Sequence, residues 1–329
     1  MNKVEKFETS SKLVIVLASY HPEPLFFEKQ IQSIQDQTRQ DWVCIVSDDS
    51  IDPHAVQFIQ TSLSSDPRFF YIQNSLKPGV VGNFENALAN IPEQSEVIFF
   101  CDQDDVWHSD KIEKIVHYFE NHPEISVVHS DLRQVDFEGI PLNSSVWSLE
   151  ERHLLPTSLF EMLLHPSVTG CSMAVRKTFL NKVLPFPRGQ DAEKILHDHW
   201  ISLIAYLEKT LGLMNQALID YRQHGKNVVG TRAASSGVLD WNKMRKFKLN
   251  LMLLPSWEKH VLANQLLQRS SQIAFTKEDR HCLLIFSQCR PFQFLFTLVN
   301  SPFFQMKNAS LYFRIFLGLI LRPWKKEEP

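Results

Sequence analysis

Short apolar runs alternate with helical periodicity over residues 12–130. Residues 12–19 and 42–47 are strand-length runs rich in β-branched side chains, which is typical of buried parallel strands. Between them, Phe27, Ile31 and Ile34 recur at the i, i+4, i+7 spacing of a helix that packs on a sheet. This alternation predicts an α/β fold with a doubly wound sheet.

The alternation of strands and helices continues to about residue 130, and beyond it the pattern becomes less regular. We expect helices and strands over residues 52–63 (helix), 69–73 (strand), 83–90 (helix), 96–101 (strand) and 127–130 (strand). A further helix begins after Asp110, a candidate N-cap with Glu113 three residues on. Beyond residue 130 five prolines interrupt the pattern, and helical periodicity without strand signals returns near Trp241. The prediction is a first domain over 1–235 and a helical C-terminal extension over 236–329.

Polar residues follow three of the predicted strands at the point where each strand ends. They are Ser19-Tyr20, Asp48-Asp49 and the run from Asp102 to Asp105. Doubly wound sheets bind ligands at the carboxyl ends of their strands, so these residues should converge on one cleft. Asp48-Asp49 would accept hydrogen bonds from a base or a ribose there, or would simply cap the next helix.

The run Asp102-Gln103-Asp104-Asp105 places three carboxylates within four residues. Crowded carboxylates repel one another, and a divalent cation removes that repulsion. Oxygen ligands suit Mn²⁺ or Mg²⁺, and a diphosphate would complete the coordination sphere. The alternative is a solvated acidic turn that caps the following helix. The apolar strand before the run and Trp107 after it favour the cation site.

Two later segments carry further candidate chemistry. His197-Asp198-His199-Trp200 places a carboxylate between imidazoles, as a general base or as a helix N-cap flanked by solvent-facing histidines. In residues 221–225, His224 is a candidate third protein ligand for the metal or a structural histidine. Arg222 is a candidate bidentate donor to phosphate oxygens.

Composition and short motifs exclude several classes of function. The chain has only 10 glycines, and neither a GxGxxG nor a GxxxxGK[ST] motif is present, which excludes the two commonest nucleotide loops. Its five cysteines include no CxxC pair, and its first residues lack the apolar stretch of a secretion signal. We therefore expect reduced thiols in a cytoplasmic protein.

Charge is distributed unevenly between the two parts of the chain. Residues 241–329 contain 14 Lys and Arg against 5 Asp and Glu, which leaves 20 against 32 for residues 1–240. A basic extension suits an anionic membrane surface or an anionic, lipid-carried substrate. No apolar run reaches the roughly 18 residues that span a bilayer. The segment 311–321 is either an interfacial helix or a terminal helix packed on the core.

The motifs, taken in order, resemble the family 2 inverting glycosyltransferases of GT-A fold, closest to their bacterial rhamnosyltransferase-like branch. They lie at residues 14–20, 33–38, 48–52, 102–107, 168–171, 197–200 and 221–225. The resemblance covers about 12–230 and implies a mixed GT-A sheet, with a nucleotide-binding half over about 12–130 and an acceptor half over about 131–235. His197-Asp198 replaces the Glu-Asp of many relatives, and the absence of a QxxRW motif implies one sugar per turnover.

The resemblance implies a role for each matching position. Ser19, Tyr20 and Asp49 match nucleoside-contacting positions, and Gln103 belongs to the same nucleotide-sugar site. Asp102 matches the ribose-binding, metal-proximal carboxylate. Asp104 matches the metal ligand, and Asp198 matches the base that deprotonates the acceptor hydroxyl. The implied cofactor is Mn²⁺ or Mg²⁺.

The leading hypothesis is an enzyme that moves a sugar, rhamnose or another deoxysugar, from a nucleoside-diphosphate donor to a lipid-linked or polysaccharide acceptor. It would act in cell-surface polysaccharide synthesis at the inner face of the plasma membrane, without a nucleic-acid partner, and its C-terminal extension would contact the membrane. Two alternatives are a nucleotidyltransferase and a catalytically silent carbohydrate-binding partner. The former would carry a Gly-rich basic loop after the first strand, which residues 20–24 lack.

Overall fold

The chain folds into two compact units. The computed structural model describes residues 10–152, 154, 156–188, 195–223, 249–288 and 290–300, with five positions between 312 and 320. Unit 1 comprises Met1–Leu155, Ser167–Phe186 and Leu196–Arg232, and unit 2 comprises Pro156–Pro166, Pro187–Ile195 and Ala233–Pro329. The expected domain boundary near residue 235 lies outside the described residues.

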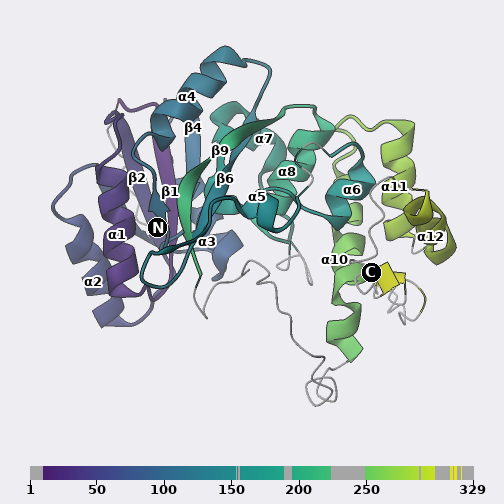
Figure 1. Cartoon of the computed structure of the whole chain (residues 1–329), viewed down its shortest axis with the longest axis horizontal. Helices are drawn as coiled ribbons and strands as arrows, with labels where there is room; N and C mark the ends of the chain where they lie inside the picture. The colour runs from purple at the N-terminus through teal and green to yellow at the C-terminus, as the bar shows by residue number, and fades with distance from the viewer. Residues whose placement is uncertain are drawn as a thin grey trace. The chain divides into compact units, whose positions relative to one another are not determined.

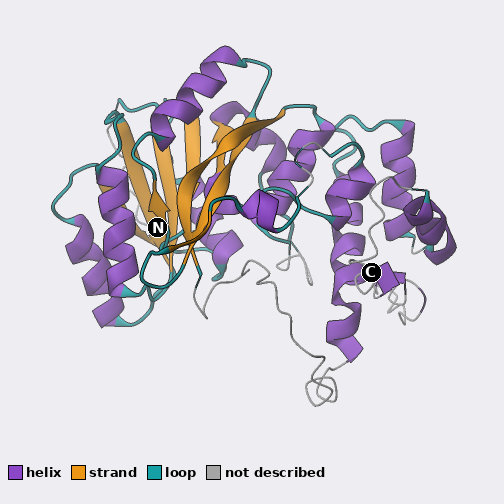
Figure 2. Cartoon of the chain, in the orientation of Figure 1, coloured by secondary structure: helices purple, strands orange, loops and turns teal. Residues whose placement is uncertain are grey.

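Unit 1 contains a mixed sheet in the order β3-β2-β1-β4-β8-β6-β9-β5, with β7 paired to β6 (Figures 1 and 2). The strands are β1 (Leu13–Ser19), β2 (Trp42–Asp48), β3 (Phe69–Gln73), β4 (Val97–Cys101), β5 (Val106–Trp107), β6 (Val127–Val135), β7 (Pro141–Asn143), β8 (Met173–Arg176) and β9 (Leu211–Arg222). The first four strands in the order are mutually parallel, whereas β8 runs antiparallel to both β4 and β6. The predicted α/β fold with a mixed GT-A-type sheet is confirmed.

Helices cover both faces of the sheet. In unit 1 they are α1 (Pro24–Gln35), α2 (Pro53–Leu63), α3 (Val80–Ala89), α4 (Lys111–Asn121), α5 (Val146–Leu149), α7 (Leu180–Val183) and α8 (His197–Leu207), with 3₁₀ turns η1 (Gly170–Ser172) and η2 (Lys177–Phe179). Strand side chains alternate between faces. Ile15 and Leu17 therefore join a buried cluster with α1 and α4 residues, while Phe100 points to the other face and lies 5.3 Å from the Phe84 ring of α3.

The strand register brings the predicted polar clusters to one edge. Ser19 pairs with Asp48, and Leu17 pairs with Cys101, so β1, β2 and β4 end side by side. Because β8 is antiparallel to β4, its first residue, Met173, lies at that same edge. The η1 turn immediately before β8 therefore joins the carboxyl edge, which confirms the expected convergence of strand exits.

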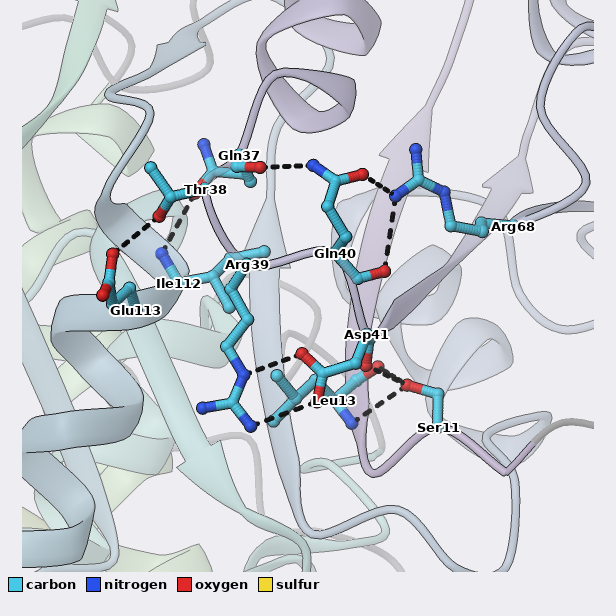
Figure 3. A network of polar contacts seen from close by, with 10 residues as sticks. All are labelled: Ser11, Leu13, Gln37, Thr38, Arg39, Gln40, Asp41, Arg68, Ile112 and Glu113. Atoms are coloured by element: carbon cyan, nitrogen blue, oxygen red, sulfur yellow. Dashed lines mark hydrogen bonds and ion pairs between the residues drawn. The ribbon is translucent and has the colours of Figure 1, made fainter.

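The opposite edge is closed by contacts between its own loops (Figure 3). Ser11 Oγ donates to the Asp41 carbonyl at 2.6 Å, and Arg39 forms an ion pair with Asp41 at 2.7 Å. The Gln37 side chain accepts from the backbone N–H of Ile112 at 3.0 Å, which ties this loop to α4. These contacts tie the segments before β1 and β2 to each other and the loop after α1 to α4.

The N-cap residues of α2 and α4 make different contacts. Asp52 caps α2, because its carboxylate accepts from the Ala55 N–H at 3.0 Å. Asp110 occupies the N-cap position of α4 but makes no capping hydrogen bond. The expected N-cap position of Asp110 is therefore confirmed, but its side chain forms an ion pair with Lys114 at 2.6 Å in place of a capping hydrogen bond.

Unit 2 is helical in its described part. It contains α6 (Leu159–Leu164), α10 (Leu249–Gln268), α11 (Lys277–Ser287) and α12 (Pro291–Val299). The rings of Phe160, Phe286 and Phe294 lie within 6 Å of one another, centroid to centroid, and join α6, α11 and α12 into one core. None of the helices in the described ranges is both long and apolar enough to cross a bilayer.

Candidate active site

The loop that follows β4 is anchored to the exit of β1. Asp102, Gln103 and Asp104 are half-buried. The Gln103 carboxamide accepts from the Tyr20 N–H at 2.8 Å and donates to the Tyr20 carbonyl at 3.2 Å. Because both bonds use the backbone, the Tyr20 side chain stays free of this contact and is 60% exposed. Gln103 therefore fixes the spacing between two of the predicted site segments.

The β2 exit carries two aspartates with different surroundings. Asp48 is buried and accepts from Ser50 and Tyr71, and burial raises the pKa of its carboxyl group above its ordinary value. Asp49 accepts from the side chain of Asn74 and from the Gly79 N–H, the latter at 2.8 Å. The Asp49 carboxylate therefore shapes a loop over residues 74–79 at the ligand edge.

Ser19 is buried at the same exit, so its contribution to a ligand site is indirect. Its carbonyl accepts from the Asp49 N–H and from the Asn83 side chain, both at 2.9 Å. These bonds join β1 to β2 and α3. Of the predicted Ser19-Tyr20 pair, Tyr20 is the side chain that solvent reaches.

Arg222 is the last residue of β9 and is 1% exposed. Its guanidinium donates to the carbonyls of Asp104 and Phe137, at 3.1 and 2.8 Å, and lies 4.6 Å from the Phe26 ring. Its backbone N–H donates to Asp105 Oδ1 at 3.2 Å. Arg222 thus holds the acidic loop in place, and a contact with donor phosphate stays a prediction. His224 lies outside the described residues.

One group of potential metal ligands occurs among the described residues, and it lies at this edge. Donor atoms of Asp102, Asp105 and Cys171 lie within 4.8 Å of one another. Asp105 is fully buried, and its Oδ2 has no hydrogen-bond partner in the part of the chain that the structure describes. A buried carboxylate oxygen without a partner is costly, and a divalent cation would satisfy it. Asp104, the predicted ligand, is not a member of this group.

Electrostatics at this group follow from burial and crowding. Burial, with the charges of Asp104 and Asp198, raises the pKa of Asp102 to about 7. Burial also raises the pKa of Asp105 well above its ordinary value. A divalent cation binds carboxylates, so its binding would release the proton from a carboxyl group whose pKa is raised in this way.

A buried lysine lies beside these carboxyl groups. Lys111, the first residue of α4, donates to the Cys171 carbonyl at 2.9 Å, and its Nζ lies 3.5 Å from the centroid of the Trp107 ring. Burial lowers the pKa of Lys111 to about 8, although the nearby acidic groups oppose that shift. The buried Lys111 side chain therefore holds the η1 turn next to the acidic group.

Asp198 reaches the site from the first turn of α8. Its Oδ2 accepts from the Gly170 N–H at 3.0 Å, and its Oδ1 accepts from the His199 N–H at 2.7 Å. Leu196, not Asp198, is the N-cap, and His197 and His199 are both buried. The alternative of a capping aspartate between solvent-facing histidines is therefore wrong.

His197 and Gly170 set the position of Asp198. The His197 ring lies 4.3 Å from Phe84 and 5.3 Å from Phe100, and burial lowers the pKa of His197. A Cβ on Gly170 would lie 2.7 Å from His197 Nε2 and 3.6 Å from Asp198 Cβ. The η1 turn approaches α8 this closely only because residue 170 has no side chain.

A sheet of this order with an acidic carboxyl edge is of the GT-A type. Residues 15–184, which are 170 of the chain's 329, match the model of glycosyl transferase family 2, and the chain belongs to this family. It is therefore a glycosyltransferase that uses a nucleotide-sugar donor.

Relatives agree with this assignment. The chain is 26% identical over 211 residues, 63% of its length and 69% of the relative's, to the uncharacterized glycosyltransferase MJ1057 of Methanocaldococcus jannaschii. S. aureus TarS residues 1–349, solved with UDP-GlcNAc, matches with a TM-score of 0.54 and 15% identity, covering 94% of this chain and 81% of that one. The same TarS fragment without that ligand matches with a TM-score of 0.55 and 14% identity, covering 94% and 80%. The TarS likeness shows the fold, and none of these matches supports a rhamnosyltransferase branch.

Three residues of the site were not predicted from sequence: Asp105 as a distinct buried carboxylate, Lys111 and Cys171. Lys111 is the first residue of α4, and a single lysine at the start of a helix gives no signal in the sequence that its side chain is buried. Cys171 was part of a family motif, but only the antiparallel pairing of β8 shows that it faces the acidic loop.

Proposed function

We propose that the protein transfers a single sugar from a nucleoside diphosphate to an acceptor hydroxyl with inversion at the anomeric carbon. The observation that carries the proposal is that Asp198 and the pair Asp102 and Asp105 lie next to the same short segment, Gly170-Cys171. Gly170 binds Asp198, and the next residue, Cys171, belongs to the donor-atom group of Asp102 and Asp105. This proximity supports a base at Asp198 next to a diphosphate site at Asp102 and Asp105.

In this proposal Asp198 is the general base. Its carboxylate is oriented by two backbone N–H groups and keeps lone pairs for the acceptor proton. The acceptor oxygen forms a bond to the anomeric carbon while the bond from that carbon to the diphosphate breaks. The acceptor proton moves to Asp198, and the bonding electron pair leaves with the diphosphate.

The donor would lie across the exits of β1, β2 and β4. Tyr20 offers an exposed ring for the nucleoside, and Asp49, with the 74–79 loop that it holds, would bound the base. Asp102, Gln103 and Asp104 would face the ribose and diphosphate, with Arg222 supporting the loop. When bound, Mn²⁺ or Mg²⁺ held by Asp102 with Asp104, or by the Asp102, Asp105 and Cys171 group, would neutralise charge on the leaving diphosphate.

We propose a lipid-linked or polysaccharide acceptor, presented at the cytoplasmic face of the plasma membrane. The support is the basic composition of residues 241–329, which suits an anionic, lipid-carried substrate. Rhamnose or another deoxysugar is the proposed donor sugar, by resemblance of motifs. UDP-GlcNAc, which TarS binds, belongs in the same screen.

The test measures nucleoside diphosphate release from a panel of nucleotide sugars with Mn²⁺ and candidate acceptors. Asp198→Asn should lower kcat by about 10²–10⁴-fold while donor binding is retained, because only the proton acceptor is lost. Asp36→Asn, on an exposed carboxylate at the end of α1, is the matched control and should retain wild-type turnover. Full activity of Asp198→Asn would refute the base assignment. Pyrophosphate release from nucleoside triphosphates would indicate a nucleotidyltransferase, and donor binding without turnover would indicate a silent binding protein.

A further inference from the structure

The candidate metal group contains a sulfur atom as well as carboxylate oxygens. Donor atoms of Asp102, Asp105 and Cys171 lie within 4.8 Å of one another, and Asp105 and Cys171 are both fully buried. Asp102 is the member of the group that solvent partly reaches. The cations that suit this group therefore differ from those that a set of carboxylates alone would take.

Contacts around the group hold its donors in place. Asp105 Oδ1 accepts from the backbone N–H of Arg222 at 3.2 Å, whereas its buried Oδ2 has no hydrogen-bond partner in the described ranges. The turn that carries Cys171 is tied down through the Cys171 carbonyl, which accepts from Lys111 Nζ at 2.9 Å. A carboxylate with one oxygen bound to the backbone and the other left open is arranged as a metal ligand with outer-shell support.

Charge balance in this buried region favours a divalent cation. When ionised, the group carries three negative charges, on two carboxylates and one thiolate. The fully buried ammonium of Lys111 interacts with all three members and supplies one positive charge. A divalent cation supplies the other two. Because buried charges are stable only when they are paired, the cation and Lys111 together would neutralise the group.

The sulfur atom selects among divalent cations. Mg²⁺ prefers oxygen ligands, whereas a thiolate favours Zn²⁺ and Co²⁺, and the affinity of a given site rises from Mn²⁺ to Co²⁺. Bonds of about 2.3 Å to sulfur and about 2.1 Å to oxygen place tetrahedral ligands roughly 3.6 Å apart, so donor atoms spread over 4.8 Å would draw together by about 1 Å. Three protein ligands leave a fourth position for a diphosphate oxygen.

We propose that Asp102, Asp105 and the thiolate of Cys171 bind a thiophilic divalent cation, Zn²⁺ or Co²⁺, more tightly than Mg²⁺. As the bond between metal and sulfur forms, the thiol proton leaves to solvent. The inference deepens the proposed function, because it names the class of metal at the donor site, and it rests on that function for the use of the metal. Binding of the cation itself requires neither donor nor acceptor.

The test is titration of the metal-free, full-length chain with Co²⁺, followed by absorption spectroscopy without nucleotide sugar. A thiolate bound to Co²⁺ gives a sulfur-to-metal charge-transfer band in the near ultraviolet, which oxygen ligands alone do not give. Wild-type protein should show this band, and an equal concentration of Mg²⁺ should not remove it. Cys171→Ser should abolish the band and lower the affinity for Zn²⁺ by more than about tenfold. Cys101→Ser is the matched control, because it removes a buried thiol outside the group and should keep the band.

Folding and transfer are measured on the same samples. Thermal melting without metal establishes that both serine variants fold, and Asp105→Asn, with the same expected loss of Zn²⁺ affinity, replaces Cys171→Ser if that variant does not. The proposal is overturned if wild-type protein shows no charge-transfer band, if the band survives Cys171→Ser, or if Mg²⁺ displaces Co²⁺. Release of nucleoside diphosphate from nucleotide sugars is scored separately. Release without the band refutes this inference alone, and the band without release refutes only the proposed transfer.

Discussion

Gly170 is the residue at which the proposed donor and acceptor sides of the site meet. Its N–H orients Asp198, its missing side chain leaves room for His197, and its neighbour Cys171 faces Asp102 and Asp105. Lys111 Nζ donates to the Cys171 carbonyl in the same turn. The position of Asp198, the proposed base, therefore depends on a turn that lacks a side chain at residue 170.

Gly170→Ala should consequently move Asp198 without removing it. The added Cβ would lie 2.7 Å from His197 Nε2, so either the η1 turn or the first turn of α8 must shift. A misplacement of about 1 Å costs on the order of 100-fold in rate, and we expect kcat to fall while the donor KM changes little.

The matched experiment is a double-mutant cycle with His197→Ala, which removes the ring that the new Cβ meets. The kcat loss from Gly170→Ala should be smaller in the His197→Ala background than in the wild type. Equal losses in both backgrounds would show that the contact does not position Asp198.

Individual elements show which parts of the fold are readable from sequence. The strands β1 to β4 and helices α1 to α4 were predicted to within a few residues, because strand-length apolar runs and helical periodicity are local signals. The two-residue β5 and its pairing with β9 were not predicted, since such a short strand has no periodicity. The burial of His197 and Arg222 was missed for a related reason: it results from packing between distant elements.

The helix caps provide a test at this scale. Asp52→Ala should destabilise the protein by about 1 kcal/mol, because the Ala55 N–H loses its partner. Asp110→Ala should cost less than about 0.5 kcal/mol, because it removes only a partly exposed ion pair with Lys114. Urea unfolding of both variants measures the difference. A loss for Asp110→Ala as large as that for Asp52→Ala would contradict the assigned roles.

At the scale of the whole molecule, a buried histidine should make stability depend on pH. Burial, with the nearby Arg152 charge, lowers the pKa of His129 in β6 from 6.5 to about 3. Below pH 6.5 the unfolded chain binds a proton that the folded chain does not, so stability falls as the solution is acidified toward pH 3. The loss is at most about 1.4 kcal/mol per pH unit.

Replacing His129 with leucine isolates this contribution. His129→Leu should flatten the loss of stability between pH 6.5 and 4, measured by urea unfolding at a series of pH values. The difference between wild type and variant removes the carboxylate titrations that both share. Identical pH profiles would mean that His129 takes up its proton at the same pH in the folded and the unfolded chain, and would contradict the lowered pKa.

The central claim is that Asp102 and its neighbours bind a donor diphosphate through a divalent cation. The most direct measurement is thermal unfolding with nucleoside diphosphates, with and without Mn²⁺, for the wild type and Asp102→Asn. At about 100 times Kd, ligand linkage should stabilise the wild type by about 2.7 kcal/mol, and only when Mn²⁺ is present. Asp102→Asn should lose this response without a lower melting temperature in the absence of ligand, because it removes a carboxyl group that Asp104 and Asp198 repel. An equal rise in melting temperature without Mn²⁺, or in Asp102→Asn, would contradict the account.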